Sequence, residues 1–267
     1  MKKTIIFIFH FFICFYYSQN FKIDYQLLYK EDSLSAEISN KNMVLLVQGK
    51  QSKFLTSKQF TADSLSLSKS KTQILGDYSF LVVNHENNLS YKYYYYLKDI
   101  YRTKEIVELK WKILPETKTI DGYHCTKAFS NYKGRKWTAW FTQDLPIQAG
   151  PYIFRNLPGM IIYLEDSTGS YRFILKSILK NPDNVDFENE YKNALTISQK
   201  KLQKLFLEYY ADPLKELKLE KEDTKFVDEN GKEIKPDYRE ITKTIQTNLK
   251  KHNNPIELSE AVKYPDK

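Results

Sequence analysis

The sequence predicts an α+β fold in which a curved antiparallel β-meander, shaped like a half-barrel, has a C-terminal helix packed on it. Segments with the alternating apolar pattern of strands follow one another from residue 21 to residue 179, joined by links of hairpin length. Such links favour antiparallel neighbours, because parallel strands need long crossovers. Apolar residues then recur at helical spacing at Leu202, Leu205, Phe206 and Tyr209. Aromatic residues make up 15% of the chain and can fill a core.

The expected strands are short and are bounded by turn-forming residues. In chain order they cover residues 21–29, 43–48, 78–84, 91–97, 106–113, 123–129, 136–142, 160–164 and 171–179. Turns are expected at residues 85–88, 115–117, 131–134 and 165–170. Residues 61–70 fit either a short helix or a loop. Tyrosine occurs on both faces of the strand at 91–97, which suits a sheet that is packed on one side, or a recognition surface.

Three regions are expected along the chain. Residues 1–18 read as a signal peptide, residues 19–212 as the sheet and its helix, and residues 213–267 as a charged, partly helical extension. In this extension residues 238–249 carry an apolar face of Ile241, Ile245 and Leu249.

The first 18 residues predict export. Lys2 and Lys3 precede an apolar run from residue 5 to residue 17, and Ser18 precedes a polar turn, where we expect cleavage. The run is shorter than the roughly 20 residues that span a bilayer, although an uncleaved anchor remains a rival. A lipoprotein at Cys14 is a further alternative, but Ile13 stands where a small residue is wanted. The expected location is the periplasm or the outer membrane.

Charge and cysteine content exclude several classes. The net charge is +8, but the lysines are spread among acids rather than gathered into a patch, so no nucleic-acid partner is expected. Weak contact with an anionic membrane surface stays open. Without the signal peptide only Cys125 remains, so no intramolecular disulfide can form. A single strand cysteine is typical of a small buried apolar residue.

No catalytic constellation can be assembled. His124 and Cys125 are adjacent in a strand, so their side chains point to opposite faces and cannot form a dyad. His85, His124 and His252 are far apart, and no His-x-x-x-His or Cys-x-x-Cys spacing occurs. We therefore expect no catalytic residue, no metal and no cofactor.

A Pro/Gly-rich connection from residue 134 to residue 163 is the most distinctive segment. It contains Gly134-Arg135, Ala139-Trp140-Phe141-Thr142, Pro146-Ile147, Gly150-Pro151 and Asn156-Leu157-Pro158-Gly159-Met160-Ile161. This pattern resembles the GLPGLI family, with Asn156 and Met160 in place of the hexapeptide's first glycine and leucine. The resemblance covers about residues 111–171, and the segment Asn254-Pro255-Ile256-Glu257-Leu258 also looks like the ending of such proteins.

The resemblance implies a small exported protein of Bacteroidetes-type bacteria, from a family without an established biochemical activity. The expected role is a non-enzymatic envelope protein that binds an apolar small molecule or an envelope protein partner. An aromatic face and the Pro/Gly-rich connection would provide the contacts. By analogy of architecture alone, the expected sheet looks like the half-barrel of periplasmic lipid and lipoprotein carriers. Alternatives are a scaffold of an outer-membrane system without a ligand cavity, and a hydrolase whose site is assembled only by the fold.

The candidate binding residues cluster in and around this connection. They are Tyr123, Arg135, Trp137, Trp140, Phe154, Asn156, Leu157, Pro158 and Gly159, with Lys127 as a further charged group. The structural alternative is a fixed crossover loop, in which Trp140, Phe154 and Leu157 plug the sheet. Asn156 suits either, because asparagine tolerates left-handed backbone.

Overall fold

The structure is a computed structural model that describes residues 20–67, 79–96, 99–182, 187, 191–215, 217 and 236–265, with the side chains of residues 65–67 excluded. The expected signal peptide therefore lies outside the described residues. The same holds for most of the charged segment between residues 216 and 235.

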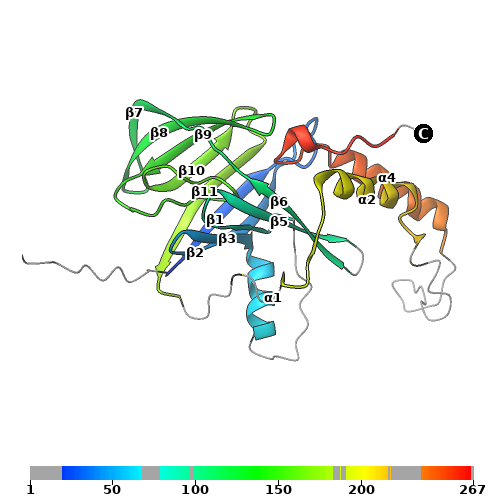
Figure 1. Cartoon of the computed structure of the whole chain (residues 1–267). Helices are drawn as coiled ribbons and strands as arrows, with labels where there is room; N and C mark the ends of the chain where they lie inside the picture. Colours follow the sequence, from blue (N-terminus) through cyan, green and yellow to red (C-terminus); the bar gives the residue numbers. More distant parts are fainter. Residues whose placement is uncertain are drawn as a thin grey trace, which may run out of the picture.

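One sheet of twelve strands forms the body of the protein (Figure 1). Its order is β12-β6-β5-β4-β3-β2-β1-β11-β10-β9-β8-β7. The strands are β1 Asn20–Tyr29, β2 Ser39–Gln48, β3 Gln51–Thr56, β4 Val82–Asn84, β5 Leu89–Tyr96, β6 Asp99–Ile106, β7 Lys112–Ile120, β8 Tyr123–Tyr132, β9 Arg135–Thr142, β10 Met160–Asp166, β11 Tyr171–Lys180 and β12 Leu195–Thr196. All neighbours are antiparallel except β12 and β6, which are parallel. The predicted α+β fold with a curved antiparallel sheet is confirmed.

The sheet is two meanders joined through its first strand. β1 pairs with β2 along one edge and with β11 along the other, so the first described strand lies in the middle of the sheet. This pairing of distant segments gives β1 a fully alternating burial pattern, with its odd-numbered residues inside.

The helices lie outside the sheet. α1 (Ser57–Leu67) follows β3, α2 (Gln199–Ala211) and α4 (Tyr238–Lys251) lie side by side beyond the ends of β5 and β6, and η2 (Leu258–Glu260) lies near the C-terminus (Figure 1). Ser198 caps α2 by accepting a hydrogen bond from the Lys201 amide, and Asp237 caps α4 in the same way. No helix among the described residues is long and apolar enough to cross a bilayer.

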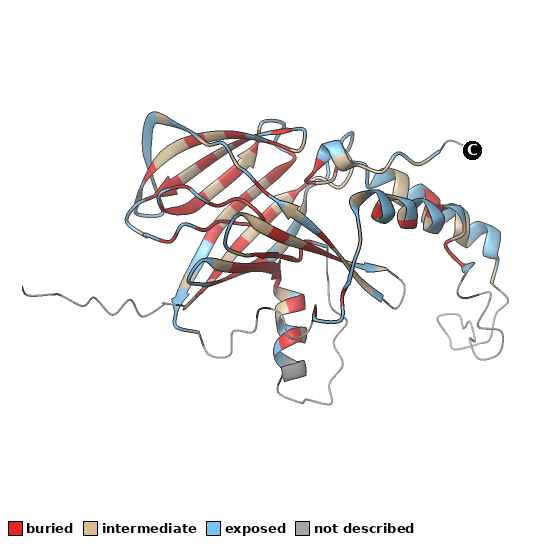
Figure 2. Ribbon diagram, viewed as in Figure 1, coloured by how far each residue is buried: buried red, intermediate tan, exposed pale blue. Residues whose placement is uncertain are grey.

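Each face of the sheet carries its own core, and the buried residues follow the strands (Figure 2). On the concave face the odd-numbered residues of β1 pack with the inward residues of β8 to β11. On the other face Leu46, Leu55 and Tyr93 pack with Tyr191 and with Phe60 of α1. The alternation within β2 and β3 supplies both cores from the same strands.

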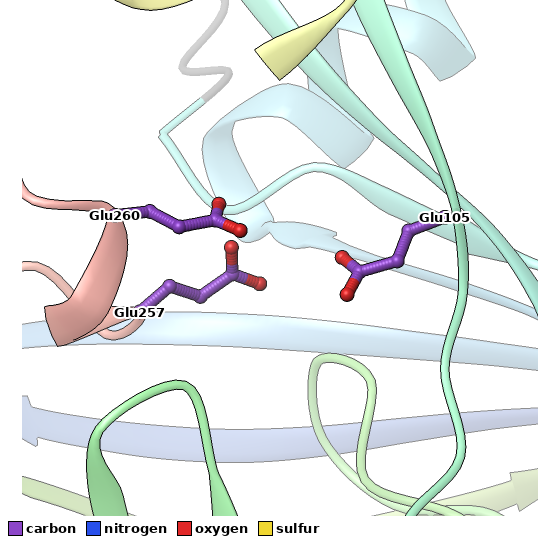
Figure 3. A group of neighbouring side chains, drawn as sticks. All are labelled: Glu105, Glu257 and Glu260. Atoms are coloured by element: carbon purple, nitrogen blue, oxygen red, sulfur yellow. The ribbon is translucent and has the colours of Figure 1, made fainter. Parts of the chain in front are cut away.

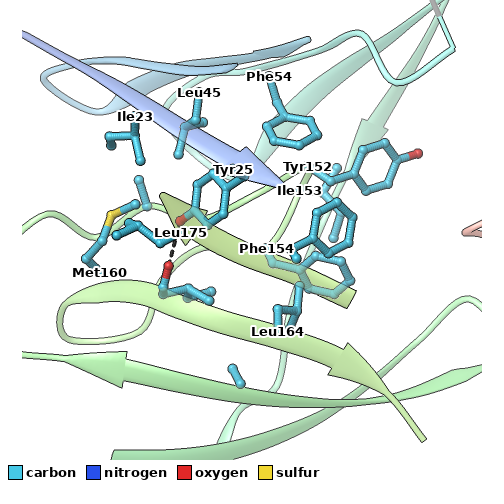
Figure 4. Packing of buried hydrophobic residues seen from close by; sticks show 14 of the residues in the cluster. Ile23, Tyr25, Leu45, Phe54, Tyr152, Ile153, Phe154, Met160, Leu164 and Leu175 are labelled. Carbon is cyan, nitrogen blue, oxygen red and sulfur yellow. Dashed lines mark hydrogen bonds between the residues drawn. The ribbon is translucent and has the colours of Figure 1, made fainter. Parts of the chain in front are cut away.

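The loop of residues 143–159 between β9 and β10, called the Pro/Gly loop below, fills the concave face. Ile153 and Phe154 are fully buried, and Figure 4 shows them beside Tyr25 and Leu164. The Phe154 ring lies 4.5 Å from that of Trp137. The loop therefore acts as part of the core on the concave face, whereas α2 and α4 pack at the end of the sheet, where Phe206 and Tyr209 contact Tyr94 and Tyr96 of β5.

Two local predictions were wrong. A strand was expected at residues 106–113 and a turn at 115–117, but β7 runs through Pro115 and β6 ends at Ile106. Proline is tolerated there because β7 is an edge strand and its register shifts between Ile113 and Thr117. The ambiguous segment near residue 61 is the helix α1.

Candidate functional site

Residues 253–261, called the C-terminal strap below, lie against the sheet and are held by a buried arginine. Arg135 of β9 forms an ion pair with Asp166 of β10, with 2.8 Å between Nη1 and Oδ2. Its Nη2 donates to the Pro255 carbonyl at 2.8 Å and to the Asn254 side chain, and its Nε donates to the Ile256 carbonyl at 3.2 Å. The planar guanidinium can reach several acceptors at once. Arg135 thus binds the chain's own C-terminal segment.

A second network fastens the strap through its glutamates. Lys92 Nζ lies 2.6 Å from Glu257 Oε2 and 2.8 Å from Glu105 Oε2. Lys133 bridges Glu105 to Glu260 in the same manner. Glu257 also accepts hydrogen bonds from the hydroxyls of Tyr132 and Tyr152, both at 3.0 Å. Figure 3 shows the three carboxylates turned toward one another.

The three carboxylates are the only group among the described residues that has metal-ligand geometry. Their oxygens lie within 4.8 Å of one another. Two lysines already supply the positive charge that a cation would bring, so the arrangement serves as an ion-pair network. We assign no metal to it.

The pKa values of the two strap glutamates are shifted in opposite directions. Burial raises the pKa of Glu257, and the charge of Lys92 only partly opposes this. Burial would also raise the pKa of Glu260, but the hydrogen bond from Glu257 and the contacts with Lys133 outweigh it and lower the pKa. The pair therefore holds one proton more readily on Glu257 than on Glu260.

The strap forms one wall of an apolar groove of about 330 Å³ between the sheet and the two long helices. The sheet side presents the aromatic rings of Tyr94, Tyr152 and Tyr171. The helices and the chain after the strap present Leu202, Phe206, Leu249, Val262 and Tyr264. Polar groups at the groove include Gln199, Gln203, His252 and the two strap glutamates. Burial raises the pKa of Tyr94 to about 12, so its hydroxyl stays protonated.

The predicted binding residues do not form one surface. Trp137 of β9 is buried, as are Phe154, Leu157 and Gly159 of the Pro/Gly loop, and Arg135 is buried at the strap. These residues form part of the core. For Phe154 and Leu157 this is the position expected if the loop is a fixed crossover that plugs the sheet.

The other predicted residues reach solvent at separate places. Asn156 and Pro158 are exposed on the loop, and Asn156 donates to the Asn88 side chain at 2.8 Å. Tyr123 and Trp140 are partly buried. The Trp140 ring is covered by Lys118, whose Nζ lies 4.1 Å from the ring centre, and by Lys127 at 5.9 Å. Binding by these residues stays a prediction.

Sequence reasoning missed the groove residues because they come from distant segments. The sequence marks Tyr94 as part of a strand with tyrosine on both faces, and it marks residues 254–258 as similar to the ending of GLPGLI proteins. Lys92 of β5 joins this strand to the strap through Glu257, and Arg135 of β9 holds the strap in place. A lone lysine or arginine in a strand gives no hint of its partner.

His124 and Cys125, which are adjacent in the sequence, are separated as their places in a strand predict. Cys125 is buried, and burial raises the pKa of its thiol, whereas His124 is exposed. The backbone amide of His124, not its ring, donates to Asp144 at 3.1 Å. The two side chains point to opposite faces of β8.

Comparison with solved structures shows the same fold in a larger protein. The crystal structures of PNGF-II in the P21 and C2 space groups are 18% and 19% identical to this chain, with TM-scores of 0.52 and 0.51. Each match covers 70% of this chain but only 33% and 32% of PNGF-II, so the chain spans about a third of that protein's length. No curated protein matches the chain.

A family comparison matches residues 27–196, which run from β1 to the end of β12. The match covers more than half of the chain and leaves out α2, α4 and the strap. The chain belongs to the family described as N-glycanase peptide, N-terminal domain.

Proposed function

We propose that this chain is an exported, non-enzymatic envelope protein that binds an apolar small molecule in the groove between the sheet and the helices. The groove itself is the observation that carries the proposal. Its volume of about 330 Å³ lies at the lower end of the range for ligand pockets, roughly 300–1,000 Å³. Aromatic and aliphatic walls with a few convergent polar groups are the usual chemistry of such pockets.

A binding role suits the way the groove is built. Its sheet wall lies within the part of the chain that the glycanase family match covers, whereas α2, α4 and the strap lie outside it. The common sheet is thereby combined with a second wall that comes from the C-terminal part of this chain. Tyr152 brings the Pro/Gly loop to the groove and Tyr94 brings the tyrosine-rich strand, the two features that the sequence indicated.

The family is named after a glycanase. The chain, however, spans only about a third of PNGF-II, so we do not propose the activity of that whole protein for it. Within the described residues, the thiol of Cys125 is buried, and Lys92 and Tyr152 bind the groove residue Glu257. Export is proposed from the basic start and the apolar run of the first 18 residues, together with the resemblance to GLPGLI proteins.

Native mass spectrometry of the mature protein, purified from its own host, tests this function first. We expect a co-purified apolar molecule, and binding of the neutral dye Nile red with increased fluorescence. Ala261→Trp places a large ring at the groove and should abolish dye binding, whereas Leu34→Trp, at an exposed position, should not. An apo mass together with equal dye binding by both variants would overturn the groove as the site.

The alternative is a scaffold for an outer-membrane system, which needs no cavity. Its contacts would be the exposed Asn156 and Pro158 of the Pro/Gly loop. A protein partner retained in the same spectra, lost on Pro158→Glu but kept in Ala261→Trp, would favour this alternative.

A further inference from the structure

A second hollow, called the rim cleft below, is lined by residues of the Pro/Gly loop on both sides of Tyr152, which itself lines the groove. Its volume is about 690 Å³. The β2–β3 turn, the β4–β5 turn, the end of β11 and residues 144–149 of the loop surround it. Strand register brings these segments to one end of the sheet, because Phe21 pairs with both Lys180 and Val47, and Ser52 pairs with Asn84.

The cleft contains a buried arginine that forms no ion pair with an acidic side chain among the described residues. Arg155 is only 8% exposed and lines the cleft. Its Nη1 donates to the His85 carbonyl at 2.7 Å and its Nη2 to the Leu89 carbonyl at 3.3 Å. Its Nε has no hydrogen-bond partner among the described residues. Burial lowers the pKa of Arg155, as expected for a charge that nothing opposite in sign compensates.

The other buried cations of the described chain show what is missing. Arg135 pairs with Asp166, Lys53 with Asp63 and Lys92 with Glu257, and each of these acids is itself buried. A buried charge without a partner is costly, and three of the four buried cations among the described residues are paired with an acid. Arg155 is the exception, and it is the one of the four that lines the rim cleft.

The surroundings add positive charge and hydrogen-bonding groups. Lys50 and Lys180 are exposed and line the same cleft. Glu86 and Asp144 also line it, but neither forms an ion pair with Arg155, and Asp144 accepts from the His124 amide instead. The amide side chains of Gln51, Asn87, Asn88, Gln148 and Asn156 complete the polar lining.

We propose that the rim cleft binds an acidic saccharide, with a sugar carboxylate held by the positive charge of Arg155, Lys50 and Lys180. Guanidinium groups match carboxylates in geometry. Amide side chains offer both donors and acceptors, as the neighbouring hydroxyls of a sugar require. A space of about 690 Å³ is far larger than a single inorganic anion needs.

Calorimetric titration with trigalacturonate, its full methyl ester and inorganic phosphate tests the proposal, because the first two ligands share the same sugar chain and differ only at the carboxyl groups, which are uncharged in the ester. We expect trigalacturonate to bind at least tenfold more tightly than its ester, with an affinity that falls as salt is added. Lys50→Gln with Lys180→Gln should weaken binding at least tenfold. The matched control, Lys104→Gln with Lys112→Gln, removes two exposed lysines from outside the cleft and should bind like the parent protein.

Arg155→Gln should weaken binding further, and its thermal unfolding shows whether the variant is folded. Arg155 also holds the β4–β5 turn, so Arg155→Gln can fail to fold. In that case the double lysine variant tests the proposal. Equal binding of acid and ester, or equal loss in the lysine variant and its control, would overturn the proposal. Phosphate that competes as well as trigalacturonate would overturn the saccharide assignment. Ala261→Trp, which alters the groove, should leave this binding unchanged.

Discussion

At the scale of single residues, the Pro/Gly loop closes through a contact that only glycine allows at position 159. Gly159 has φ +151°, and an added Cβ would lie 2.0 Å from the Thr142 carbonyl oxygen. Gly159→Ala must therefore move backbone, and we expect a loss of at least about 3 kcal/mol in the free energy of unfolding. Gly122→Ala is the control, because Gly122 has φ +84° but open space around it, and should cost only about 1–2 kcal/mol. Equal losses in denaturant titrations would contradict the steric argument.

Cys125 gives a second prediction at this scale. The residue is fully buried and burial raises the pKa of its thiol, so both access and thiolate content are low. A thiol reagent such as Ellman's should leave the native protein unlabelled and label one thiol of the mature chain after denaturation. Cys125→Ala should leave ligand binding unchanged. Rapid labelling of the folded protein would contradict this.

At the scale of elements, local patterns predict strands whose two faces differ and fail at the edges of the sheet. β1 alternates along its whole length and β11 along its first half, and both were predicted within a residue or two. β7 is exposed on nearly all its residues, so no alternation marks it, and Pro115 gave a false turn. The unassigned β3 has buried residues on both faces, which leaves no period to read.

The candidate site was less predictable than the fold because its parts are joined only by tertiary contacts. Asn156 was expected to tolerate left-handed backbone and has φ +69°. The groove, however, depends on Arg135 holding a segment about 120 residues away in the chain. The proposal for the rim cleft depends equally on Arg155 having no acidic partner among the described residues. Neither the presence nor the absence of a partner leaves a local pattern in the sequence.

The strap is the element whose attachment Arg135 controls. Arg135→Met removes the cation that pairs with the buried Asp166 and removes the guanidinium donors of the strap carbonyls, and we expect a loss of about 3–5 kcal/mol in the free energy of unfolding. Hydrogen exchange should rise most in residues 254–261. Arg172→Met is the control, because its pair with Glu165 is 3.7 Å long and half-exposed, and it should cost less than about 1 kcal/mol. Unchanged exchange of the strap in Arg135→Met would refute its anchoring role.

The same element should loosen as the pH rises. Burial raises the pKa of Glu257 above 4.5 in the folded protein, so its stabilising contribution is complete below 4.5 and is lost as the pH rises through the raised value. The lowered pKa of Glu260 acts in the opposite sense, and its contribution is lost only as the pH falls below 4.5. From pH 4.5 towards neutrality, amide hydrogen exchange in the strap, corrected for the intrinsic exchange rate at each pH, should therefore accelerate. Glu257→Gln should reduce this slope, whereas Glu208→Gln, exposed on α2, should not; equal slopes would contradict the assignment.

At the scale of the whole molecule, the strap makes the C-terminus part of the sheet's core rather than an appendage. Asn254, Ile256 and Glu257 are buried against residues of β5, β8 and β9. A chain ending at residue 252 exposes these contacts and leaves Lys92 without one of its carboxylates. We expect it to unfold in one transition at a clearly lower denaturant concentration.

A chain ending at residue 261 separates the effect of the strap from that of the groove. It keeps the bonds of Arg135 and Lys92 but loses Val262 and Tyr264 from the groove wall, including the stacking of Tyr264 on Tyr210. The sheet should then keep most of its stability, because the buried ion pairs remain, while Nile red binding falls. If the two truncated chains unfold at the same denaturant concentration, the strap contributes nothing beyond the terminal residues. If only the shorter chain is destabilised, the fold of the sheet depends on the strap.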